Sequence, residues 1–155
     1  MIRVLFVCLG NICRSPMAEA VFKDLLRKES LADQFSVDSA GLGRWHVGEK
    51  PHRGTLAILA ENNISSEGIT ARQIDASDLE KFDYIIVMDD ENKKGINGWK
   101  KSSNARIYKL LDFVSESKGQ DVPDPYYTGN FQEVYQLIEQ GCHELLKYIR
   151  EKERI

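Results

Sequence analysis

The 155-residue chain contains only three cysteines. An odd number of cysteines in a domain of this size argues against a framework of disulfide bonds. Cys8 and Cys13 have the spacing C-x4-C, but no second pair follows, so a zinc site is not expected. The motifs G-x4-G-K-[ST] and H-E-x-x-H are absent as well. The sequence therefore predicts an activity that uses neither a metal nor a cofactor.

Long apolar stretches and an excess of positive charge are also missing. The apolar segment Val4–Leu9 is too short for a signal sequence or a membrane span. The formal net charge is −3, so a basic surface for nucleic acids or membranes is not expected. These absences predict a cytoplasmic protein that binds neither nucleic acid nor membrane. Length and composition predict a single domain over residues 1–155.

Strand and helix patterns alternate along the chain. Short apolar runs predict strands at 3–7, 35–39, 83–88 and 106–110. Helical patterns occupy 16–28, 55–62, 90–97 and 131–149, whereas 40–53 reads as a glycine-rich loop and 111–123 has no assignable structure. This alternation predicts a three-layer α/β domain, with a four-stranded parallel sheet and helices on both faces. Ligands of such sheets bind beyond the carboxyl ends of the strands.

The loop after the first predicted strand carries the most information. Cys8 and Arg14 have the spacing C-x5-R, and Ser15 and Pro16 follow at once. Ser15 is expected to cap the next helix, with Pro16 at its first position and an acid in its first turn. Backbone N–H groups at a helix N-terminus bind anions, and together with Arg14 they favour the thiolate of Cys8. The loop therefore predicts both a nucleophile and a phosphate pocket. Its other expected members are Leu9, Gly10, Asn11, Ile12, Cys13 and Ser15.

Several residue types in and near this loop suit phosphate binding. Gly10 and Asn11 tolerate the positive φ angles that a tight anion-binding loop needs. The planar guanidinium of Arg14 can bind two phosphoryl oxygens and stabilise negative charge in the transition state. Three further cations lie between residues 40 and 54, where they either add positive charge to the site or form a solvated loop. They are Arg44, Lys50 and Arg53.

Three segments resemble the signatures of low-molecular-weight protein tyrosine phosphatases. They are the C-x5-R-S-P loop from Cys8, Trp45–Gly48 with Pro51 and His52 behind it, and the sequence DPYY from Asp124 to Tyr127. The resemblance covers nearly the whole chain. It implies a bacterial enzyme that hydrolyses phosphotyrosine in protein substrates and is inhibited by phosphate-like oxyanions.

The resemblance also implies roles for single residues. The Cys8 thiolate would attack phosphorus and form a phosphocysteine, with Arg14 as the phosphate clamp. Asp124 would protonate the leaving phenolate and then act as base on the hydrolytic water. The hydroxyl of Ser15 would donate to the Cys8 sulfur, while a network including Ser39 and His52 would hold Asn11. Ile12, Trp45, Tyr126 and Tyr127 would line a cleft deep enough for phosphotyrosine and too deep for phosphoserine.

Some roles stay open at this stage. Cys13 either forms a reversible disulfide with Cys8 or is a small buried residue at the helix start. His52 either supports the site or is merely packed or solvated. Trp45, Tyr126 and Tyr127 have packing as their alternative role, and the two tyrosines are possible sites of phosphorylation by resemblance. Cys142 lies on the apolar stripe of the last helix and is expected in the core.

Other functions compete with this interpretation. Protein-arginine phosphatases on the same scaffold carry threonine where this chain has Ile12. An arsenate reductase needs further cysteines after the middle of the chain, and no cysteine lies between Cys13 and Cys142. A non-catalytic phosphate-binding module would be expected to lose Cys8 or Asp124, and this chain retains both.

Overall fold

The computed structural model describes residues 1–99 and 106–155. Its strands are β1 (Ile2–Cys8), β2 (Phe35–Gly41), β3 (Tyr84–Val87) and β4 (Arg106–Lys109). They pair in parallel in the order β2-β1-β3-β4. The helices are α1 (Arg14–Lys28), α2 (Arg53–Glu61), α3 (Asp78–Lys81), α4 (Asp90–Asn97), α5 (Pro125–Thr128) and α6 (Phe131–Glu153). The predicted four-stranded parallel sheet is confirmed.

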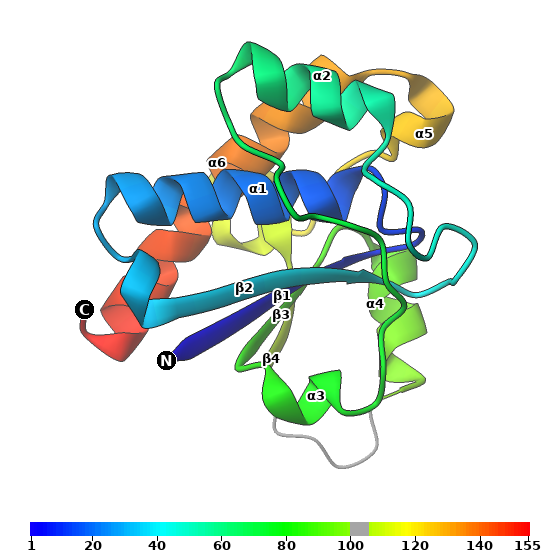
Figure 1. Ribbon diagram of the computed structural model, residues 1–155. Coiled ribbons are helices and arrows are strands. Elements are labelled where there is room, and N and C mark those ends of the chain that lie inside the picture. Colours follow the sequence, from blue (N-terminus) through cyan, green and yellow to red (C-terminus); the bar gives the residue numbers. More distant parts are fainter. Residues whose placement is uncertain (100–105) are drawn as a thin grey trace.

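Helices cover both faces of this sheet, which gives three layers (Figure 1). Side chains alternate between the faces of a strand. In β1, Val4 and Phe6 pack with the apolar residues of α1 and α6, whereas Leu5 and Val7 pack with those around α3 and α4. Each face therefore has its own apolar cluster, and the residues from Val4 to Cys8 are all buried.

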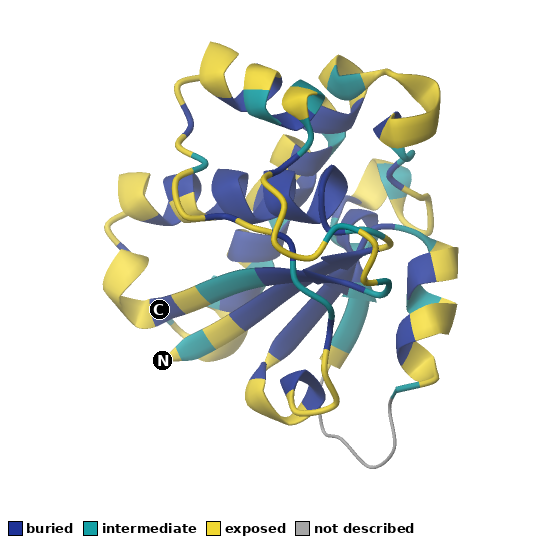
Figure 2. Ribbon diagram, turned by 45° about the vertical axis from the view of Figure 1, so that its right-hand side comes forward, coloured by how far each residue is buried: buried dark blue, intermediate teal, exposed yellow. Residues whose placement is uncertain are grey.

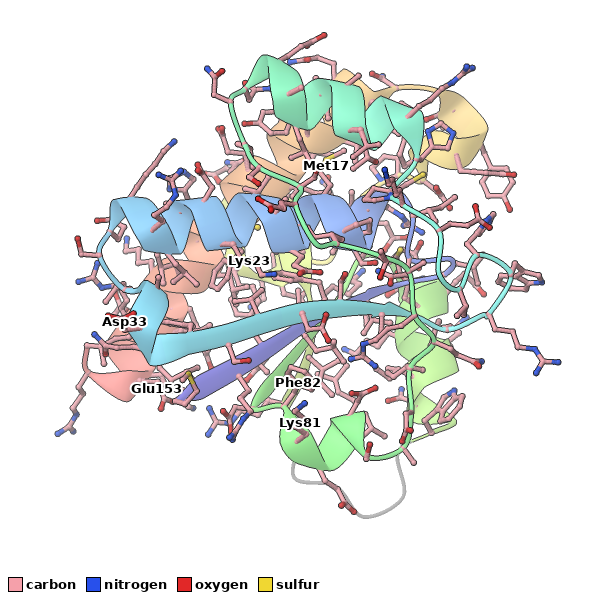
Figure 3. All side chains as sticks on the ribbon, in the orientation of Figure 1. Met17, Lys23, Asp33, Lys81, Phe82 and Glu153 are labelled. Atoms are coloured by element: carbon pink, nitrogen blue, oxygen red, sulfur yellow. The ribbon has the colours of Figure 1, made fainter. Side chains whose placement is uncertain are left out.

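The burial pattern follows these layers. The strands are buried near the centre of the molecule, and the outer helices expose one side (Figure 2). Met17 on α1 and Phe82 after α3 lie on opposite sides of the sheet (Figure 3). None of the helices in residues 1–99 and 106–155 is long and apolar enough to cross a membrane.

Several segments differ from the sequence predictions, which include neither α3 nor α5. The region after β4, for which the sequence predicts no structure, contains the short 3-10 helices Leu110–Phe113 and Ser115–Ser117. Helix α1 begins at Arg14 and has Cys13 as its N-cap, so the prediction that Ser15 caps the helix is wrong. The first turn of α1 contains no acid, and Glu19 lies one turn further on. The Ser15 hydroxyl is engaged outside the helix, with Cys8 and Asn11.

The fold gathers the polar segments at one edge of the sheet. Cys8 ends β1, and Asp89 follows β3 by two residues. Because β1 lies between β2 and β3, the strand that follows it in the chain is on one side and the two later strands are on the other. A crevice at the carboxyl end of such a strand is the usual ligand site of an open α/β sheet.

Candidate active site

The Cys8 sulfur lies at the N-terminus of α1, and the residue as a whole is only 3% exposed. The backbone N–H of Ser15 donates to Sγ at 3.5 Å, and the Ser15 hydroxyl lies 3.0 Å from the same atom. Both groups lie within hydrogen-bonding reach of the sulfur, at the positive end of the helix dipole. The predicted contact between the Ser15 hydroxyl and the Cys8 sulfur is therefore present in the structure.

Asn11 shapes the loop between β1 and α1. Its φ of 58° is positive, as expected, and its side chain is buried. Its Nδ2 donates to Ser15 Oγ at 2.7 Å and to Ser39 Oγ at 3.0 Å. Its Oδ1 accepts the backbone N–H of Arg72 at 3.0 Å. With both polar atoms of its side-chain amide engaged, Asn11 holds the loop in a backbone conformation that few residue types adopt.

A buried carboxylate sets the direction of the hydrogen bonds in this network. Ser39 Oγ donates to Glu19 Oε1 at 2.6 Å, so it must accept from Asn11. Asn11 uses its second amide hydrogen on Ser15 Oγ, which accepts it. The hydroxyl hydrogen of Ser15 is not used on Asn11, so it is available for donation to a Cys8 thiolate 3.0 Å away. Glu19 was not identified from the sequence, although an acid on the buried face of α1 is a usable signal.

Arg14 is fixed by three partners. Nη1 donates to Asp89 Oδ2 at 2.6 Å and to the carbonyl oxygen of Val122 at 2.9 Å, and Nη2 lies 3.3 Å from Asp124 Oδ2. Burial by itself would lower the pKa of Arg14, but the charges of Cys8, Asp124 and Asp89 raise it above its ordinary value. The guanidinium therefore stays cationic and is held in one plane while only 2% exposed.

Asp124 reaches the same place from the far end of the chain. It is the N-cap of α5, where Oδ1 accepts the backbone N–H of Tyr126 at 3.1 Å. The other carboxylate oxygen faces Arg14. The acid and the cation are 110 positions apart in sequence and in contact in the structure.

A cleft of about 490 Å³ opens over the loop. Trp45, Tyr126 and Tyr127 line it and are 68%, 54% and 76% exposed. Such a volume is within the usual range of small-molecule sites. The remaining lining residues are Cys8, Leu9, Gly10, Ile12, Cys13, His46 and Asp124. The predicted nucleophile, acid and aromatic residues thus share one cavity.

Two supports of the loop differ from expectation. The side chain of His52 does not join the Asn11 network, because its Nδ1 accepts the N–H of Gly54 and caps α2. Instead, the backbone N–H of His52 donates to the carbonyl oxygen of Ile12 at 2.7 Å. Gly10 does not adopt positive φ. A Cβ atom at Gly10 would lie 3.2 Å from His46 Cδ2, so steric room is what favours glycine there.

Other contributors have weak sequence signals. The Thr55 hydroxyl donates to the carbonyl oxygen of Cys13 at 3.1 Å, and Arg72 and Val122 act through their backbones. Nothing in the local sequence marks a backbone contact. Asp89 could have been identified as a polar residue just after a buried strand, where α/β ligand sites lie.

Cys13 is buried beside the site. Burial, with the negative charges of Cys8 and Asp124, raises the pKa of its thiol to about 12. Cys13 is therefore a neutral thiol at physiological pH. Cys142 is fully buried in α6, as expected.

Metal ligands are not clustered in the described part of the chain, where no group of three or more His, Cys, Asp and Glu side chains could hold an ion. Arg44, Lys50 and Arg53 are exposed, whereas Arg14 is buried beside the nucleophile. The fold and the site together define a phosphate-handling α/β protein with a cysteine at the carboxyl end of its first strand.

Comparison with known proteins agrees with this class. A family model described as low molecular weight phosphotyrosine protein phosphatase matches residues 3–155. The low molecular weight protein-tyrosine-phosphatase YfkJ of Bacillus subtilis is 54% identical over the full length of both chains. Its crystal structure superposes with a TM-score of 0.95, covering 98% of this chain and 96% of that one. A Drosophila arginine phosphatase is 35% identical with a TM-score of 0.86, covering 95% of this chain and 97% of that one.

The chain therefore belongs to the low molecular weight protein tyrosine phosphatase family. It is a hydrolase that acts on phosphoproteins, as the resemblance in its sequence implied.

Proposed function

We propose that Cys8, Arg14 and Asp124 carry the hydrolysis of phosphotyrosine. The Cys8 thiolate attacks phosphorus, the phosphorus–oxygen bond to the tyrosine breaks, and Asp124 delivers a proton to the departing phenolate. Water then attacks the phosphocysteine while Asp124 takes its proton, which releases phosphate and restores the thiolate. The observation that carries this proposal is that Cys8 and Asp124 line one cleft while Arg14 contacts Asp124.

The proposed mechanism assigns charge stabilisation to groups already in place. The phosphoryl oxygens would bind the backbone N–H groups of the 8–15 loop and the Arg14 guanidinium, which is held by Asp89 and Val122. Fixed donors of this kind stabilise the transition state without reorganising during the reaction. The Ser15 hydroxyl, whose oxygen lies 3.0 Å from Cys8 Sγ, would donate to the sulfur and stabilise it as it leaves phosphorus.

Several finer properties belong to the same proposal. Arg14 supplies the positive charge that a metal ion would otherwise provide, which supports metal-independent catalysis. Phosphate-like oxyanions would occupy the same loop and inhibit. We place the whole catalytic unit in one domain over residues 1–155. Three buried cysteines without disulfide bonds are consistent with a cytoplasmic location.

The substrate class is tested directly by phosphate release from matched peptides. We expect turnover of a phosphotyrosine peptide in the presence of EDTA, with much slower turnover of phosphoserine and phosphoarginine peptides of the same flanking sequence. The aromatic cleft favours an aryl group, and the short phosphoserine side chain does not span its depth. Activity that is lost with EDTA and restored by zinc or magnesium would contradict the proposal.

Ile12 is expected to select between tyrosine and arginine. It is buried in the cleft and belongs to the loop that binds phosphate. An aliphatic side chain packs against an aryl ring, but it leaves guanidinium N–H groups without an acceptor, which costs about 1–3 kcal/mol. Ile12→Thr should therefore raise kcat/KM for phosphoarginine by roughly five- to 150-fold and lower it for phosphotyrosine.

The measurement is kcat/KM for both substrates with both proteins. Ile12→Val, which shortens the side chain without adding a hydroxyl, is the matched control and should leave the preference for tyrosine in place. A wild type that already prefers phosphoarginine would show that the tyrosine assignment is wrong. That alternative is worth testing because the 35% identical Drosophila protein is an arginine phosphatase.

A further inference from the structure

A buried lysine lies at the end of β4 and is not part of the cleft lining. Lys109 ends β4 and is only 4% exposed. Its Nζ donates to the carbonyl oxygen of Gly119 at 2.7 Å, to Asp121 Oδ1 at 3.0 Å and to Asp90 Oδ1 at 3.0 Å. All three hydrogens of the ammonium group therefore have acceptors. One side chain thus ties together the end of β4, the start of α4 and the segment 119–121.

The anchored residues are next to those that hold the active site. Asp90 follows Asp89, which binds Arg14, and Asp121 precedes Val122, whose carbonyl oxygen accepts from Arg14. The backbone N–H of Asp90 also donates to Asp121 Oδ1 at 3.1 Å, and that of Val122 donates to the carbonyl oxygen of Met88 at 2.9 Å. Two residues after Val122 the chain reaches Asp124.

The geometry points to Lys109 as a positioning residue for Asp124, acting through Asp121 and the segment between them. This inference rests on the proposed role of Asp124 as general acid. The segment 119–124 lies in a connection between β4 and α5, so its position depends on such contacts. Arg14 holds the segment at Val122 and Asp124, and Lys109 holds it at Gly119 and Asp121.

The charge of Lys109 is maintained in this setting. Burial alone would lower its pKa, but Asp121 and Asp90 raise it above the ordinary value. The ammonium group therefore remains protonated over the range in which the enzyme is assayed. A neutral side chain of similar length would fill the space but leave both carboxylates and the Gly119 carbonyl without this donor.

The test is the dependence of kcat/KM on the leaving group, since kcat/KM includes every step up to departure of the phenol. A general acid matters most for a poor leaving group. Because displacement of a catalytic group by about 1 Å can cost up to about 10²-fold, Lys109→Met should lower kcat/KM about tenfold for phenyl phosphate. For p-nitrophenyl phosphate, whose phenolate needs less protonation, we expect less than about a threefold loss.

Two further variants separate positioning from general destabilisation. Tyr84→Phe removes a buried hydroxyl that binds Glu153 at 2.8 Å and Arg106 at 2.8 Å, at the opposite end of β3 and β4. It should lower thermal stability without changing the ratio between the two substrates. Asp121→Ala removes the partner of Lys109 in the segment 119–124 and should reproduce the change in the ratio between the two substrates. This variant keeps the inference testable if Lys109→Met does not fold.

A double-mutant cycle completes the experiment. If Lys109 and Asp121 act as one unit, the double variant should lose little more than either single variant. An unchanged substrate ratio in Lys109→Met or in Asp121→Ala would overturn the inference. If Asp124→Asn selectively slows phenyl phosphate but the Lys109 and Asp121 variants leave the substrate ratio unchanged, only the role of Lys109 is refuted and the role of Asp124 stands. Absence of selectivity in Asp124→Asn would instead refute the proposed acid.

Discussion

Replacement of Cys8 by serine is expected to abolish turnover while inorganic phosphate still binds. A serine hydroxyl is not ionised by the N-terminus of α1, so the attacking atom loses its charge. We expect kcat to fall on the order of a millionfold, the scale seen when an enzyme loses its nucleophile. The phosphate-binding groups, Arg14 and the loop backbone, are unchanged, and removal of the negative sulfur favours an anion nearby.

Turnover is measured with phosphotyrosine peptide, and phosphate binding by calorimetry. Cys142→Ser is the matched control, because it makes the same change on the buried face of α6, away from the cleft. It should reduce thermal stability and leave kcat near the wild-type value. Substantial residual turnover in Cys8→Ser would mean that another group attacks phosphorus.

Replacement of Asp124 by asparagine is expected to slow poor leaving groups far more than good ones. Asparagine retains the oxygen that caps α5 at Tyr126, so the local structure should be kept. It cannot deliver a proton to the phenolate of tyrosine, whose conjugate acid has a pKa of about 10. We expect kcat/KM for phenyl phosphate to fall by about 10²- to 10⁴-fold, the usual contribution of general acid catalysis.

Comparison with p-nitrophenyl phosphate provides the internal control, because the nitrophenolate departs without full protonation. The factor by which its kcat/KM falls should be at least about ten times smaller than the factor for phenyl phosphate. Equal losses for the two substrates would show that Asp124 only positions Arg14, which it contacts at 3.3 Å.

Local patterns in the sequence were sufficient to predict the sheet. The buried strand before Cys8 and the periodic apolar face of α6 are visible because their spacing follows the geometry of a strand or a helix. The start of α1 was placed wrongly, since a serine before a proline has the usual pattern of an N-cap. In the folded chain the Ser15 hydroxyl has better partners in Cys8 and Asn11.

The sequence by itself predicted Cys8 as nucleophile and Arg14 as clamp and determined the alternation of strands and helices along the chain, because these depend on residues close together in the chain. Only the tertiary structure decided how Arg14 is held, which groups surround the Ser15 hydroxyl and how Lys109 contacts the segment 119–121. Arg14 is held by Val122, 108 positions away, and the loop residue Asn11 accepts a hydrogen bond from Arg72, 61 positions away. Such contacts have no local pattern, since they form only when parallel strands bring their carboxyl ends to one edge.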